Sequence, residues 1–115
     1  WVSGLGEQLQ GLLASDEVAR TGRSARTLVK TADVRVVLIA LGAKGVIQEH
    51  HAPGALTIQA LAGTTEVSAG GAVYRLQAGD LLALPDGMAH ALRAMAAGGL
   101  LLTIALRRDV RGDDA

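Results

Sequence analysis

The stretch Gly79-Asp80-Leu81-Leu82-Ala83-Leu84-Pro85-Asp86-Gly87-Met88-Ala89-His90 decides the fold of this 115-residue chain. A short apolar run lies between two turn signals, and its length suits a buried strand rather than a helix. Pro85 fixes its own φ and Gly87 accepts a positive φ, so the chain turns tightly and returns at His90. We therefore expect His90 at the start of the next strand, where its imidazole can point into whatever the sheet encloses.

The spacing of Gly79, Pro85, Gly87 and His90 resembles the second sequence motif of the cupin superfamily. That motif runs Gly, five residues, Pro, one residue, Gly, two residues, His, three residues and Asn, and only the last position departs here, being Ala94. The resemblance implies a small, single-domain bacterial cupin. Its fold would be all-β, a double-stranded β-helix (jelly-roll) barrel with a short N-terminal helix.

Composition excludes several classes of function. Aromatic residues make up only 2% of the chain, which argues against an aromatic cage or a base-stacking surface. The formal net charge is zero and the basic residues are scattered, so we expect no nucleic-acid or membrane partner. Cysteine is absent, which removes disulfides, thiolate nucleophiles and thiolate metal sites. With no signal peptide and no long apolar run, a soluble cytoplasmic protein is expected.

The N-terminal part differs from the rest of the chain in the spacing of its apolar residues. Four leucines share one face of a predicted helix over Val2 to Leu13, whereas Ser15 to Gly22 is polar and suggests a connecting loop. We divide the chain into an N-terminal helix and connector (1–23), a β-barrel (24–107) and a flexible tail (108–115).

Short β-like runs separated by glycine-containing breaks fill the barrel region. With no helix between them, such regularly spaced turns predict an antiparallel sandwich or barrel. The expected strands are Ala25 to Thr31, Val34 to Leu41, Gly45 to His51, Ala55 to Ala62, Thr64 to Ala69, Ala72 to Gln77, Leu81 to Leu84, Ala89 to Ala96 and Leu100 to Arg107.

The first cupin motif is less complete than the second. Gly63 fits its final glycine, but Leu56 occupies the position of the family's glutamate ligand. Its histidine pair has two possible registers. If His50 is the first histidine, the second position is Ala52; if His51 is the second, the first position is Glu49.

The two registers imply different sites, because neighbouring residues of a regular strand face opposite sides. With His51 inward, Glu49, His51 and His90 converge as two imidazoles and one carboxylate. Such a set can hold Fe, Zn, Mn or Ni as a divalent ion. With His50 inward, Ile47 points outward, and Gln48, His50 and His90 are the candidate ligand-binding residues.

Two functions from different classes follow. The first is a small-molecule-binding cupin with a reduced metal site, since Ala52, Leu56 and Ala94 stand where the family places polar residues. The alternative is a metal-dependent enzyme of the dioxygenase or isomerase type, acting on a small organic compound.

A homodimer is also expected. In the runs Val34 to Leu41 and Leu100 to Leu106, both the odd- and the even-numbered residues are mostly apolar. A strand with one face in water would instead alternate between apolar and polar residues. The side chains on one face of these strands fill the barrel. Those on the other face need to be covered, either by the N-terminal helix or by a second copy of the chain.

Overall fold

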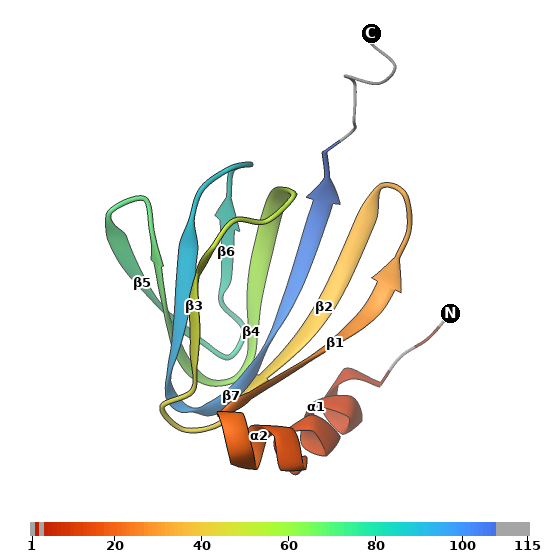
Figure 1. Cartoon of the computed structure of the whole chain (residues 1–115), viewed down its shortest axis with the longest axis vertical. Helices are drawn as coiled ribbons and strands as arrows, with labels where there is room; N and C mark the ends of the chain where they lie inside the picture. The colour runs from red at the N-terminus through yellow and green to blue at the C-terminus, as the bar shows by residue number, and fades with distance from the viewer. Residues whose placement is uncertain (1, 3, 108–115) are drawn as a thin grey trace, which may run out of the picture.

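The computed structural model, which describes Val2 and residues 4–107, is an all-β jelly roll with two short helices at its N-terminal end (Figure 1). The predicted tail, residues 108–115, lies outside the described residues. The elements are α1 Leu5–Leu13, α2 Asp16–Thr21, β1 Arg23–Lys30, β2 Val34–Leu41, β3 Val46–His50, β4 Gly54–Ala69, β5 Ala72–Gln77, β6 Leu81–Leu84 and β7 His90–Leu106.

Two long strands, β4 and β7, pair with each other along most of their length and build both layers of the barrel. The first layer joins β1, β2, residues 98–106 of β7, residues 54–60 of β4, and β6. The second layer joins β3, residues 90–96 of β7, residues 64–69 of β4, and β5. All of these pairs are antiparallel, and no pairing joins β1 to β3, so the barrel has an open seam between these two edge strands.

The layers are connected by bends within β4 and β7, at places where the sequence predicted breaks between separate strands. Those predicted breaks, at Gly63 and at Gly98-Gly99, are wrong: the strands continue through them. Gly63 has φ of 73°. A Cβ there would collide with the Ala97 carbonyl oxygen, so only glycine allows the two strands to bend together at this point.

The N-terminal segment forms two helices rather than one helix and a loop. Helix α1 begins at Leu5, not at Val2. The predicted loop contains α2, whose N-terminus is capped when the Ser15 Oγ accepts a hydrogen bond from the Val18 N–H at 3.3 Å. Its C-terminus ends at Gly22, which has φ of 83°.

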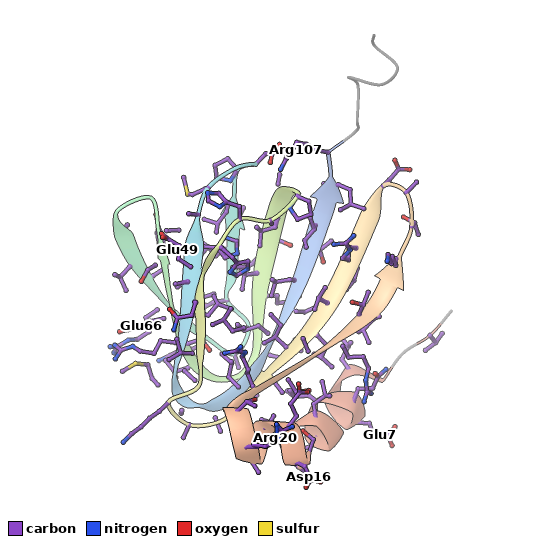
Figure 2. All side chains as sticks on the ribbon, viewed as in Figure 1. Glu7, Asp16, Arg20, Glu49, Glu66 and Arg107 are labelled. Atoms are coloured by element: carbon purple, nitrogen blue, oxygen red, sulfur yellow. The ribbon has the colours of Figure 1, made fainter. Side chains whose placement is uncertain are left out.

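The core consists of two aliphatic clusters. The larger lies between the two layers and includes Ile58, Leu92 and Leu100, all fully buried. In the smaller, Leu9 and Leu12 of α1 pack against Leu38 on the outer face of β2. Figure 2 shows side chains filling the space between the layers, while labelled charged residues such as Glu7, Asp16 and Arg20 surround the helices.

Among Val2 and residues 4–107, the cover on the outer face of the first layer is the helical segment at one end. Away from α1, it has a groove of about 280 Å³ with no charged residue in its lining. Its outward-facing side chains are those of Val34, Ala55, Thr57, Ala83, Thr103 and Ala105. No helix among the described residues has the length and apolar character needed to cross a membrane.

Candidate functional site

His90 is the first residue of β7 and is fully buried on the inner face of the second layer. The Pro85-Asp86-Gly87 turn returns the chain into this strand, as its sequence predicts. The His90 Nδ1–H donates a hydrogen bond to the Met88 carbonyl oxygen at 3.1 Å. The ring is therefore anchored by its own turn, and its Nε2 is the free nitrogen.

His50 reaches the same place because β3 contains a bulge. Ile47 pairs with Leu92 and His50 with His90, so three steps along β3 match two along β7. Ile47 packs against the inner core, which makes the expectation of an outward Ile47 wrong. Because of the bulge, His50 points inward rather than His51. The centroid of the His50 ring lies 4.3 Å from that of His90, and the two ring planes make an angle of 58°.

Both histidines use the same anchor. The His50 Nδ1–H donates to the Gln48 carbonyl oxygen at 3.0 Å, two residues earlier, as His90 does with Met88. In a neutral ring, this bond leaves Nε2 with a free lone pair. Burial lowers the pKa of His90, and the charges that His50 and His51 can carry lower it further. His90 is therefore neutral near pH 7, and within the described part of the chain its buried Nε2 has no hydrogen-bond partner.

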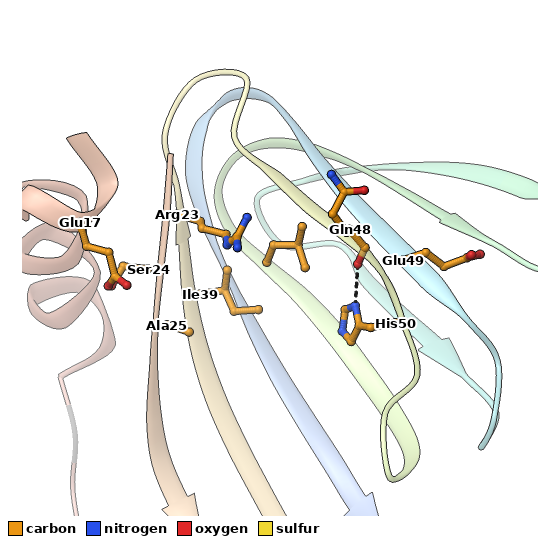
Figure 3. A pocket seen from close by; sticks show the side chains of 9 residues that line it. Glu17, Arg23, Ser24, Ala25, Ile39, Gln48, Glu49 and His50 are labelled. Atoms are coloured by element: carbon orange, nitrogen blue, oxygen red, sulfur yellow. Dashed lines mark hydrogen bonds between the residues drawn. The ribbon is translucent and has the colours of Figure 1, made fainter. Parts of the chain in front are cut away.

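The open seam between β1 and β3 holds a cavity of about 470 Å³ beside this pair (Figure 3). One wall is formed by Arg23, Ser24, Ala25 and Ile39, and the other by Ile47, Gln48, Glu49 and His50. Glu17 of α2 also lines the cavity. Arg23 spans the seam, because its Nη1 donates to the Val46 carbonyl oxygen of β3 at 3.1 Å. At the rim, the Ser24 hydroxyl donates to the Glu17 carboxylate of α2.

The structure separates the residues of the predicted three-ligand set. In Figure 3 the Glu49 side chain extends from the side of β3 opposite the His50 ring. His51 follows the end of β3 and is exposed. Among Val2 and residues 4–107, no group of three histidine or acidic side chains is placed to hold a metal ion. Glu49, His51 and His90 are thus not brought together, whereas His50 and His90 are.

The three motif positions that lack polar residues are all buried. Ala52 is 6% exposed, Leu56 3% and Ala94 2%, and all three belong to the inner core cluster. Aliphatic packing therefore occupies the places where the cupin motifs put further polar groups. Arg23 and Ser24 were not among the predicted site residues, because their role depends on where the seam opens.

The comparisons with known proteins agree with this architecture. The family model for the AraC-like ligand binding domain matches residues 36–104. The chain belongs to this family. The matched range begins in β2 and ends in β7, so it includes both anchored histidines. Among curated proteins, no match is found.

Several solved structures similar to this AraC-like domain are described as cupins. A conserved protein of unknown function from Streptococcus pyogenes is 26% identical, with a TM-score of 0.71 over 83% of this chain and 88% of that one. An RmlC-like cupin from Desulfovibrio desulfuricans is 25% identical, with a TM-score of 0.70 over 82% and 92%. Salicylate 1,2-dioxygenase from Pseudoaminobacter salicylatoxidans has a TM-score of 0.74 at 18% identity, with 87% of this chain matching 31% of the enzyme, and shows the fold alone.

Proposed function

We propose that this chain is a small-molecule-binding cupin domain whose ligand occupies the seam cavity and contacts His50. The observation that carries this proposal is the pair of anchored imidazoles beside a 470 Å³ cavity. A cavity of this size is within the range of small-molecule sites. The membership of the AraC-like ligand-binding family supports the same class of function.

The polar groups of the cavity wall suit a polar ligand. Gln48 supplies an amide, Arg23 a guanidinium, and the exposed His50 a ring whose Nδ1 is already engaged. Ile39 and Ile47 provide apolar contact between these groups. Together with Glu17 and Glu49, which also line the cavity, these polar groups can orient a ligand through hydrogen bonds and charge.

The donor set is too small for a resident catalytic metal. Catalytic zinc sites use three protein ligands, and iron sites of the facial type use two histidines with a carboxylate. Here the described residues offer two imidazoles, with aliphatic side chains at Ala52, Leu56 and Ala94. We therefore propose a reduced metal site and assign no chemical step to a metal.

One observation favours the alternative of a metal-dependent cupin enzyme. Histidines that bind metals usually donate their second ring N–H to a carbonyl or carboxylate, and both rings here do so. Elemental analysis of protein purified without chelator, beside His90→Leu, separates the alternatives. Stoichiometric Fe, Zn, Mn or Ni that disappears in the variant would support the enzyme, whereas weak or substoichiometric binding supports the reduced site.

The binding function is tested with a screen of small polar fragments, detected by the rise in melting temperature that ligand binding causes. Fragments that stabilise the wild-type protein should lose most of their effect in His50→Ala and keep it in His51→Ala. The second variant is a matched control, because it removes an exposed imidazole from the adjacent position. Equal losses in both variants, or none in either, would contradict the proposal.

We also propose that the chain forms a homodimer through the uncharged groove on the outer face of the first layer. Two copies meeting there would bury apolar and hydroxyl groups without like-charge repulsion, and symmetric pairing is the commonest form of association. Ala105→Glu should shift sedimentation equilibrium toward monomer, while Ala32→Glu, at an exposed turn outside the groove, should not. A wild-type protein of monomer mass at all concentrations would contradict the dimer.

A further inference from the structure

Strand β5 is the last strand of the second layer, and one of its edges is open. All of its residues, Ala72–Gln77, pair with β4, and no other strand among the described residues pairs with it. Figure 1 shows β5 at the side of the barrel, away from the helices. The strand contains neither lysine nor proline, and its register has no shift. It therefore lacks the features that usually keep an edge strand from pairing with another chain.

The backbone groups that point away from β4 can be identified from Gln77. Its N–H donates to the Asp80 carboxylate at 2.8 Å, and its carbonyl oxygen accepts from the Asp80 N–H at 2.9 Å. Both groups of Gln77 thus point to the open edge. Because this direction alternates along a strand, the N–H and C=O groups of Val73 and Arg75 also point there. Among the described residues, these groups have no backbone partner.

Val73 and Arg75 complement each other across a two-fold axis. When Val73 of one copy lies opposite Arg75 of a second, antiparallel copy, the N–H of each residue meets the C=O of the other. The symmetric pair forms the same bonds, so every open group of both edges is hydrogen-bonded. Tyr74 then lies directly opposite Tyr74 of the second copy. Asp80 fixes the extent of this pairing, since it already occupies the groups of Gln77.

The side chains of β5 also suit this register. Val73 is 63% exposed and Tyr74 40%, so both have apolar surface that a second copy can cover. Two tyrosines directly opposite each other form an aromatic cross-strand pair, which stabilises a sheet. Val73 packs beside the aliphatic part of the facing Arg75. The Arg75 guanidinium already pairs with Glu66 at 3.1 Å, which lessens the repulsion between the arginines of the two copies.

We propose that β5 is a self-pairing edge, through which two copies of this chain join their second layers into one continuous sheet with Tyr74 at the two-fold axis. The contact is separate from the uncharged groove, whose lining residues lie in β2, β4, β6 and β7, and it does not depend on that groove. One short strand buries less surface than a protein–protein interface of standard size, so the pairing is expected at high protein concentration.

The test uses single cysteines, because the chain contains none of its own. Opposite residues of a non-hydrogen-bonded antiparallel pair have Cα atoms about 4.5 Å apart, within the range of a disulfide. Copper phenanthroline with oxygen should therefore oxidise the two thiols of Tyr74→Cys to an intermolecular disulfide, measured by non-reducing gel electrophoresis. Val73→Cys is the matched control. In this register its two copies lie about 8 Å apart, too far for a disulfide, so Tyr74→Cys should react several-fold faster.

Random collision would give the opposite order, because Val73 is more exposed than Tyr74, and that result would overturn the proposal. Absence of the disulfide in both variants would also overturn it, because a second copy would then not occupy this edge. Adding Val73→Pro to Tyr74→Cys removes an N–H that points away from β4, so the reaction should slow several-fold, whereas Val73→Thr should leave it unchanged. Ala105→Glu, in the groove, should not slow it; a disulfide lost with Ala105→Glu would assign the contact to the groove and contradict edge pairing.

Discussion

The two ends of the barrel differ in how well their apolar side chains are packed and their buried polar atoms are hydrogen-bonded. At the helical end, Leu38 and Leu41 are fully buried, with α1 packed over the outer face of β2. Away from the helices, the inner face carries His90 and Arg35, each with a buried nitrogen that has no partner among the described residues. The difference teaches that helix packing stabilises one end of the fold, whereas the other end holds buried polar groups without partners among the described residues.

The largest effect on stability is expected at the helical end. Leu38→Ala removes a fully buried side chain between β2 and α1 and should lower the free energy of unfolding by about 2–5 kcal/mol, measured by urea denaturation. Leu81→Ala is the matched control, since Leu81 is 63% exposed, and it should change stability little. Equal losses in the two variants would mean that burial by the helix does not distinguish this end.

A substitution behind the seam cavity should reverse the pattern, with little effect on stability and a large effect on binding, because the His90 ring packs against the ring of His50, which lines the cavity. His90→Leu removes the unpartnered Nε2 and also the hydrogen bond to Met88. These changes oppose each other, so the free energy of unfolding should stay within about 1 kcal/mol of wild type. Fragments that bind the wild-type protein should bind the variant much more weakly in a thermal-shift titration. A variant that unfolds, or that binds normally, would remove the contrast between the two ends.

The pH dependence of stability gives the smallest of these effects. Burial holds the pKa of His90 below its ordinary value of 6.5, so the unfolded chain binds a proton more readily than the folded one. This contribution is fully present above about pH 6.5 and declines as the pH falls toward the folded-state pKa. Denaturation series between pH 7.5 and 5 on wild type and His90→Leu, a range of about one unit or more either side of the histidine pKa, should show the steeper acid loss in wild type. Parallel curves would mean that His90 ionises as freely in the fold as in the unfolded chain.

Much of the barrel could be predicted from the sequence because its turns have clear signals. The bounds of β2, β5 and β6 agree with the prediction, since Gly or Pro and Asp residues flank these runs. The same rule failed for β4 and β7, because a glycine can also mark a bend within a continuous strand. Helix α2 was missed although Ser15 and Gly22 are common capping residues, because its six residues contain little apolar periodicity.

The candidate site was predictable in part for a related reason. The turn before His90 determines where that ring lies, so one motif was sufficient to place it. The choice between His50 and His51 depends on the bulge between Ile47 and His50, and a period-two pattern contains no signal for a bulge.

The most direct test of the central claim is to map where a bound fragment lies, using amide chemical shifts of ¹⁵N-labelled protein. Titration with a fragment that stabilises the wild-type protein should move the amides of Ser24, Ala25, Gln48 and His50, on the two walls of the seam. In His50→Ala, the same titration should produce much smaller shifts. Shifts confined to the outer groove, at Thr57, Thr103 and Ala105, and unchanged in His50→Ala, would contradict the account.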